Sequence, residues 1–282
     1  MHIRNPVEWG VHQVRLTGSA FGRTMDRRHA AAVPEIRRIS LSDIRHALAR
    51  GIDDFGAFRS DVVFLAIIYP VVGLVLARLI FGYGMLPLLF PLASGFALIG
   101  PVAAVGLYEM SRRREASVPA GWADAFEVFR SPRLGSILLF GLLLLAIFAV
   151  WIGVASAIYD LTLGPEPPVS ATAFLRDVFT TELGWTMMAV GIGVGFLFAA
   201  FVLAISVVSV PLLLDRDVGL AAAIGTSLRS VMTNPGPMAA WGLIVAAALV
   251  LGSLPLFLGL IFVMPVLGHA TWHLYRRIVG PE

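Results

Sequence analysis

The chain has 282 residues, of which 58% are apolar and 14% charged, and its formal net charge is +3. A typical soluble domain has about 25% charged residues, so this composition indicates a polytopic membrane protein. The absence of cysteine excludes disulfides, thiolate metal sites and cysteine nucleophiles. Apart from histidine, the basic residues are all arginines beside apolar runs, so we expect membrane lipid rather than nucleic acid as the partner.

The N-terminal region differs from the rest of the chain. Residues 1–39 mix Arg, Gly, His and Pro without apolar periodicity, which predicts a loosely ordered tail before a membrane domain at residues 40–282. No apolar segment typical of a secretory signal follows the early arginines. We therefore expect the N-terminus to stay in the cytoplasm.

A helical pattern begins at Ser42, which we expect to be the N-cap. Apolar residues then recur at spacings of three and four, at Ile44, Leu48, Ile52 and Phe55. Arg45 and Arg50 lie off this face, and Gly51 weakens the helical pattern. The segment is predicted to be an amphipathic helix on the inner leaflet that leads into the first span.

Six segments are apolar enough to span a membrane, because a bilayer core of roughly 30 Å requires about 20 residues per helix. They are approximately residues 62–82, 86–110, 134–159, 184–214, 237–252 and 255–275. The last two share one apolar stretch that we expect to reverse near Gly252 and Pro255. A single long tilted helix with two internal prolines is the weaker alternative. The prediction is therefore an all-α bundle of six transmembrane helices.

The arginines predict the orientation of this bundle. With the N-terminus inside, nineteen arginines fall on the cytoplasmic side and Arg176 falls outside, while Arg78 lies near the outer end of the first span. This distribution satisfies the positive-inside rule. We therefore expect both termini to be cytoplasmic.

The second and sixth segments share a spacing of two prolines, a glycine and an arginine pair. Pro91, Gly95, Pro101, Arg112 and Arg113 reappear 164 residues later as Pro255, Gly259, Pro265, Arg276 and Arg277. This indicates an internal repeat, and both copies should leave the bilayer on the same side. With the surface helices expected before the first, third and fifth spans, the pattern predicts three units, each an inner-leaflet amphipathic helix followed by a transmembrane hairpin.

His269 and His273 lie one helical turn apart near the inner end of the sixth segment, so both imidazoles project from one face. They are weak candidates for a metal or haem site, because two ligands from one helix cannot occupy opposite faces of a haem. The other four histidines lie near the N-terminus. We expect interfacial anchoring or hydrogen bonding by these two histidines, and no cofactor.

Glu109 occupies the position in the second segment that His273 occupies in the sixth, so the two could approach each other. An ion pair of Glu109 with Arg112 or Arg113 is the expected arrangement, and a proton or substrate site is the alternative.

Asp215 closes the fourth span with Arg216 and Asp217, which we expect to form a solvated, self-paired cluster. The candidate site is thus an inner-face polar cluster of Glu109, Arg112, Arg113, Asp215, His269 and His273.

Other patterns allow both structural and functional interpretations. Prolines within the spans could break helices as transporters do, but no ionisable residue lies near the span centres, which argues against ion-coupled transport. Gly191, Gly193 and Gly195 favour close helix packing. The chain has no HExxH, GxSxG or Walker motif. We therefore expect that it is not an enzyme.

Three blocks carry a family resemblance: Tyr69 to Glu115, PLLLDRDVG at 211–219, and GHATWHLYRR from Gly268. Through them the chain, from Glu35 to Ile278, resembles a bacterial integral-membrane family catalogued as domain of unknown function 2189. The resemblance implies a bacterial inner-membrane protein and supplies no catalytic residues. Some members are labelled cytochrome c oxidase subunits, but an oxidase core needs histidines on several membrane helices, and only one segment here has any.

Three functions remain open from the sequence. The leading hypothesis is a non-enzymatic accessory or scaffold component that acts on lipid or on a membrane complex, with another membrane protein as a possible partner. The alternative is a transporter or channel for an apolar or weakly polar solute. An accessory haem or copper protein rests only on His269 and His273.

Overall fold

The computed structural model describes residues 34–66, 78, 86–118, 121, 133–255 and 258–280. Within these residues the chain forms ten α-helices and one short 3-10 turn, and the all-α prediction is confirmed there. The helices are α2 (Leu41–Ala66), α4 (Leu89–Ala103), α5 (Val105–Glu115), α6 (Leu134–Thr162), α7 (Ala171–Thr180), α8 (Glu182–Ser206), α9 (Ser209–Asp215), α10 (Leu220–Thr233), α11 (Pro235–Ser253) and α12 (Leu260–Val279).

Three of the expected spans appear as helices long and apolar enough to cross a membrane. They are Leu134–Thr162, Glu182–Asp215 and Pro235–Ser253 among the described residues. The second combines α8 with the short helix α9. The predictions at 134–159, 184–214 and 237–252 therefore agree with helices of suitable length and composition.

The other three expected spans do not appear as single apolar helices of spanning length among the described residues. Most of the segment 62–82 lies outside the described residues. The segment 86–110 is divided at Ala104 into α4, which contains Pro101, and the more polar α5. Proline cannot donate a backbone hydrogen bond, which weakens a helix at that point. The last segment begins as a helix at Leu260, and most side chains of its second half are buried within the protein.

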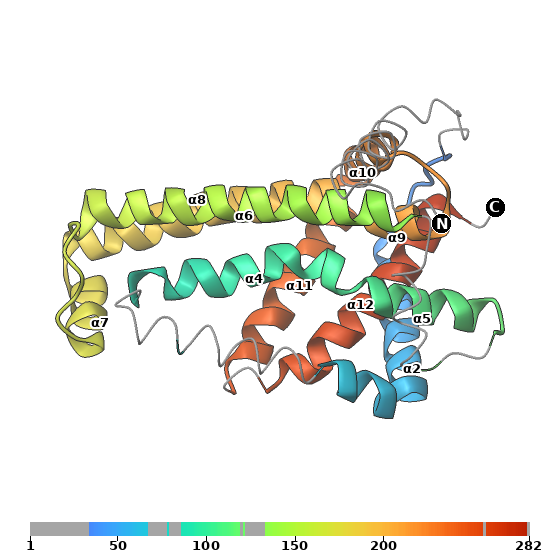
Figure 1. The fold of residues 1–282 in the computed structure, drawn as a ribbon, viewed down its shortest axis with the longest axis horizontal. Coiled ribbons are helices and arrows are strands. Elements are labelled where there is room, and N and C mark those ends of the chain that lie inside the picture. Colours follow the sequence, from blue (N-terminus) through green and yellow to red (C-terminus); the bar gives the residue numbers. More distant parts are fainter. Residues whose placement is uncertain are drawn as a thin grey trace, which may run out of the picture.

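The hairpin of α6 and α8 forms the long side of the molecule (Figure 1). Trp151 of α6 packs against Phe198 of α8 with ring centroids 5.3 Å apart. Gly195 lets the helices approach, because an added Cβ would lie 3.1 Å from the Trp151 ring, whereas Gly191 and Gly193 have open space. The Trp151 indole also donates a hydrogen bond of 3.0 Å to the Pro91 carbonyl and so joins α4 to the hairpin.

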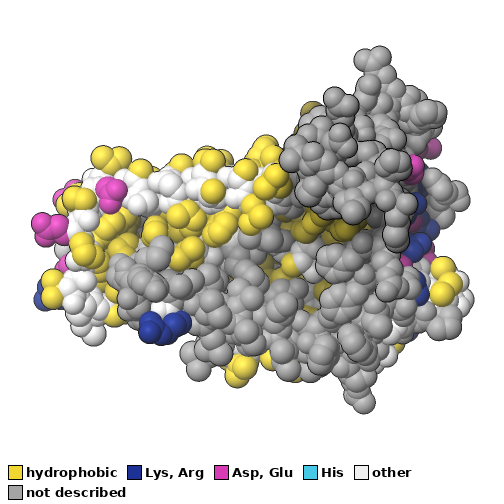
Figure 2. Space-filling view, in the orientation of Figure 1, with side chains coloured by type: hydrophobic (Ala, Val, Ile, Leu, Met, Phe, Trp, Pro, Cys, Tyr) yellow, Lys and Arg dark blue, Asp and Glu magenta, His cyan; other side chains and the backbone are white. Residues whose placement is uncertain are grey.

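The outward faces of these helices are covered with large apolar side chains. Figure 2 shows hydrophobic side chains along the α6 and α8 hairpin and charged ones toward the two ends of the molecule. The exposed residues include Leu138, Leu142, Leu145 and Val150 of α6, Ile192, Phe196, Leu197 and Phe201 of α8, and Leu243, Val250 and Leu251 of α11. A continuous apolar surface of this kind is unfavourable in water and compatible with lipid chains.

Helix α7 closes the end of the hairpin that lies opposite α9 (Figure 1). Ser170 caps it by accepting a hydrogen bond from the Ala173 backbone N–H at 3.1 Å. Phe174 packs toward Tyr159 of α6, while Phe179 is exposed. This short helix lies in the loop between the spans predicted at residues 134–159 and 184–214.

Helix α2 packs along α12, and the two lie side by side in Figure 1. The predicted helix is present, but it begins at Leu41 and its first turn is capped by Ser40 and Asp43 rather than by Ser42. Asp43 accepts hydrogen bonds from the backbone N–H and the hydroxyl of Ser40 at 2.9 and 2.8 Å. The sequence interpretation therefore placed the cap two residues too late.

The buried face of α2 also differs from the prediction. It follows Ile44, Ala47, Gly51, Asp54 and Phe58, whereas Ile52 is 57% exposed. Gly51 explains the difference, because a Cβ there would lie 2.7 Å from the Ala270 backbone nitrogen and 2.8 Å from the Val266 carbonyl oxygen. The glycine that weakens the helical pattern is therefore a point of close approach between α2 and α12.

The chain segment before α2 is held at the junction of α10 and α11. Asn234, which is buried, accepts a hydrogen bond from the Ile39 backbone N–H at 2.8 Å and donates to the Arg37 carbonyl at 3.1 Å. The Arg37 backbone N–H donates to the Ile278 carbonyl at 2.8 Å. These bonds fix the last residues of the predicted tail beside the end of α12.

Replacing Gly51 with alanine tests the close contact of α2 and α12. We expect Gly51→Ala to lower the free energy of unfolding by about 1 to 3 kcal/mol, because backbone atoms must move to accept the new methyl group. The measurement is thermal or denaturant unfolding of the purified protein in detergent.

Gly56→Ala on the same helix is the matched control, because nothing lies within 4 Å of a Cβ at Gly56. This change should leave stability unaltered or raise it by up to about 1 kcal/mol through helix propensity. Equal effects of the two substitutions would show that α2 and α12 are not in the described contact.

Candidate functional site

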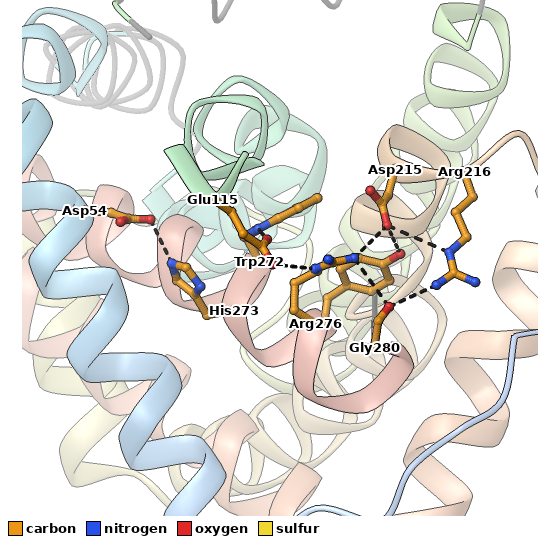
Figure 3. A network of polar contacts seen from close by, with 9 residues as sticks. Asp54, Glu115, Asp215, Arg216, Trp272, His273, Arg276 and Gly280 are labelled. Atoms are coloured by element: carbon orange, nitrogen blue, oxygen red, sulfur yellow. Dashed lines mark hydrogen bonds and ion pairs between the residues drawn. The ribbon is translucent and has the colours of Figure 1, made fainter. Parts of the chain in front are cut away.

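The predicted polar residues gather where α2, α5, α9 and α12 meet. Figure 3 shows two groups of contacts in this region, one at Asp54 and His273 and one around Asp215 and Arg276. We call the first the Asp54 group: Asp54, Ser111, Arg114, His269 and His273. The second is the Asp215 group: Glu115, Asp215, Arg216, Trp272, Tyr275 and Arg276.

Asp54 is the centre of the first group although it lies on α2 and was not among the predicted site residues. Its Oδ2 accepts a hydrogen bond from the Ser111 hydroxyl at 2.6 Å and lies 2.8 Å from His273 Nε2. Its Oδ1 pairs with the Arg114 guanidinium. The Ser111 Oγ is also 2.8 Å from His269 Nδ1. One buried carboxylate thus joins α2 to α5 and α12.

The centre of the Asp54 group is shielded from solvent, whereas the side chain of Arg114 is 40% exposed. Asp54 is 2% exposed, while Ser111 and His269 are fully buried. Burial raises the pKa of the Asp54 carboxyl, but the hydrogen bonds from His273 and Ser111 outweigh this effect and hold the pKa at about 2. The carboxylate is therefore ionised at neutral pH and accepts hydrogen bonds only.

The sequence prediction did not include Asp54, because the buried face of α2 was predicted from apolar residues at helical spacing. The buried residues Ala47, Gly51 and Asp54 are also spaced by three and four, and they share a face with Ile44 and Phe58. The small pair Ala47 and Gly51, four residues apart, is the signal of close helix packing that could have identified this face.

Glu109 forms the ion pairs that the sequence favours. Its carboxylate accepts hydrogen bonds from Arg112 Nε and Nη2 at 2.8 and 2.7 Å and from Arg113 Nε at 3.0 Å. The sequence also allowed Glu109 to approach His273. In the structure His273 is paired with Asp54 instead. Glu109 is 4% exposed. Its charge is compensated by Arg112 and Arg113 of the same helix.

Asp215 pairs with its neighbour Arg216, as expected from the sequence, but it is largely buried and has further partners on α12. Its Oδ2 accepts a hydrogen bond from the Tyr275 hydroxyl at 2.7 Å and pairs with Arg276 at 3.3 Å, besides its neighbour Arg216 at 3.8 Å. Two α12 residues therefore fasten the end of α9. The prediction missed them because Tyr275 and Arg276 are distant in sequence.

Glu115 attaches α5 to the same part of α12. It accepts hydrogen bonds from Trp272 Nε1 and Arg276 Nε, each at 3.0 Å. Arg276 also lies over the Trp272 ring, 6.0 Å from its centroid. The guanidinium of Arg276 thus bridges two carboxylates, one from α5 and one from α9, as Figure 3 shows.

Comparison with known protein families identifies the middle of the chain. Residues 89–215 match the family described as predicted integral membrane protein, DUF2189. The resemblance inferred from the sequence is confirmed over these residues, which run from α4 through α9. Comparison with curated proteins and with solved structures finds no match for the chain.

The DUF2189 segment supplies only part of the polar cluster. It contains Glu109, Ser111 and Asp215, whereas Asp54 and His269 lie outside it. The Asp54 and Asp215 groups therefore connect the DUF2189 segment to α2 before it and α12 after it. The chain is an integral membrane protein with several apolar helices of spanning length.

His269 and His273 were the weak candidates for metal binding. Among the described residues, no group of three or more His, Cys, Asp or Glu side chains has the arrangement to hold a metal ion. His269 Nδ1 and His273 Nε2 are instead engaged with Ser111 and Asp54. Their geometry thus corresponds to the hydrogen-bonding role expected from the sequence.

Asp54→Asn tests how much the central carboxylate stabilises this arrangement. We expect the free energy of unfolding at neutral pH to fall by about 2 kcal/mol, the value that corresponds to lowering the Asp54 pKa to about 2. Because the folded-state pKa is depressed, this contribution is present above the unfolded-state pKa of about 4. It is lost as the pH falls from about 4 to about 2. Unfolding measured across this range checks both statements.

Asp53→Asn is the matched control, since Asp53 is the exposed neighbour on the same helix. It should change stability by less than about 0.5 kcal/mol. A stability difference between Asp54→Asn and the parent that stays constant down to pH of about 2 would contradict the pairing described for Asp54.

Proposed function

We propose that the protein is a non-enzymatic accessory or scaffold component of the bacterial inner membrane, which acts on lipid or on a membrane complex. The observation that carries this proposal is that the buried polar side chains of the protein bond to one another between helices. Asp54, Ser111 and His269 are buried and bonded to one another, so they join helices instead of facing a substrate.

The outward surface supports the same function. Large apolar side chains of α6, α8 and α11 are exposed over the length of these helices. Such a surface can contact lipid chains or the apolar face of another membrane protein. The rigid attachment of the inner helix ends through Glu115, Asp215 and Arg276 would hold that surface in a fixed shape.

We further propose six spans in three hairpins related by internal repetition, with both termini in the cytoplasm. Support comes from the arginines, because Arg112, Arg216 and Arg276 all lie at the end of the molecule where α5, α9 and α12 meet. By the positive-inside rule this end faces the cytoplasm. Helix α7, at the opposite end of the α6 and α8 hairpin, would then lie at the outer surface.

One observation favours the alternative of a transporter or channel for an apolar or weakly polar solute. The helix interruption at Ala104, three residues after Pro101, resembles the broken helices that line transporter sites. An accessory haem or copper protein has less support, because His269 and His273 are both hydrogen-bonded within the Asp54 group.

Co-purification in a mild detergent tests the scaffold proposal. A photoreactive amino acid at Phe196 of α8 or Leu243 of α11, both exposed, would fix contacts in the living cell before purification. Mass spectrometry of the adducts should find a discrete second membrane protein or one lipid class enriched above its share of the membrane. Val169, in the loop before α7 and 99% exposed, is the control position and should give neither.

Recovery of the protein alone, with lipids in the proportions of the bulk membrane at Phe196 and Leu243, would overturn the scaffold proposal. Solute uptake into vesicles containing only this protein would favour transport instead. A Soret band in the spectrum of the purified protein would favour the haem interpretation.

A further inference from the structure

The positions of the protons in the Asp54 group follow from its geometry. The Ser111 Oγ lies 2.6 Å from Asp54 Oδ2 and 2.8 Å from His269 Nδ1. An ionised carboxylate can only accept, so the single hydroxyl proton of Ser111 is donated to Asp54. His269 must then donate its Nδ1–H to Ser111, and Nε2 of the neutral ring carries a lone pair.

That second nitrogen of His269 is buried and unpaired. His269 is fully buried, and its Nε2 makes no hydrogen bond. The Phe58 ring stacks on the imidazole with ring centroids 6.1 Å apart. A buried polar atom without a partner is uncommon and destabilising. The unpaired Nε2 at the contact of α2 and α12 is therefore a candidate for a functional role.

The charged groups near the His269 imidazole already compensate one another when the ring is neutral. The Asp54 carboxylate of α2, which accepts the Ser111 hydroxyl proton, is also paired with Arg114 of α5 and with His273 of α12. His46, on the outer face of α2, is close enough to His273 for their charges to interact. Since Asp54 is already paired with Arg114, a proton on Nε2 adds an uncompensated positive charge to a buried site.

We propose that His269, with Asp54 and Ser111, forms a buried proton-binding site that controls the docking of α2 on α12. The neutral ring keeps the two helices packed through Gly51 and through the hydrogen bonds of Asp54. Proton uptake at Nε2 introduces net charge between the helices and favours a state in which α2 has moved away and water reaches the site. This inference does not depend on the proposed scaffold function.

The stability change has a defined sign. A histidine that is neutral when buried and protonated when released makes the packed state weaker as the pH falls. The released state, in which His269 meets water, has a pKa near 6.5. Acidification below that value therefore shifts the population toward released α2.

Thiol labelling can detect the release directly, because the chain has no cysteine of its own. Ala47 on the buried face of α2 is fully buried, and Ala49, two residues later, is exposed. Separate Ala47→Cys and Ala49→Cys variants would be treated with dithiodipyridine, which reacts in acid. We expect the ratio of their labelling rates to rise about tenfold as the pH is lowered from about 7 to about 4.

Two histidine variants separate the site from general acid effects. His269→Asn keeps an amide N–H for Ser111 and cannot take up a proton, so its labelling ratio should stay constant with pH. His46→Gln, on the exposed face of α2, should leave the acid response of the parent unchanged. A constant ratio in the parent, or the same rise in His269→Asn, would overturn the proposal.

A second measurement applies to the parent chain and covers the case in which His269→Asn does not fold. Nitrogen NMR of histidine-labelled protein should show His269, identified by its displacement in Ser111→Ala, as the Nδ1–H tautomer at neutral pH. Both nitrogens should carry protons below the labelling transition. An Nε2–H tautomer at neutral pH would contradict the proposed site.

Discussion

The need to pair polar groups away from water governs how this chain is assembled. In an apolar environment an unpaired charge or hydrogen-bonding group is strongly unfavourable. Helices α6 and α8 carry charged residues only near one end, at Asp160 and Glu182, and α11 carries none. The ion pairs of the polar cluster lie where the ends of other helices meet. There, Asp54 and Arg276 each connect three helices, and the DUF2189 segment is attached to α2 and α12.

Much of the fold could be predicted from composition and periodicity. The helices at α6, α8 with α9, and α11 lie where apolar length alone places them, because a run of some 20 apolar residues without charge has few other stable conformations in lipid. Less predictable was the break at Ala104, since Pro101 and Pro265 have the same sequence context and only the first is soon followed by an interruption. Helix α12 packs against α2 and α5 and stays helical through Pro265.

The site was predicted in part. Pairing of Glu109 with Arg112 and Arg113 follows from helical spacing, which one sequence reveals. The partners of His273 and Asp215 do not, because Asp54 and Tyr275 are brought in by long-range contacts. The small residues Ala47 and Gly51 were the one local sign that this face of α2 is buried, and the more conspicuous leucine and isoleucine pattern obscured it.

We propose that the apolar helices place the polar cluster on the cytoplasmic side of the membrane and α7 on the opposite side. Single cysteines at Met232 of α10 and at Val169 before α7, both highly exposed, can be treated in intact cells with a thiol reagent that does not cross the inner membrane. The account predicts labelling of Val169→Cys in intact cells and of Met232→Cys only after the membrane is opened. Labelling of both positions from the same side would contradict it.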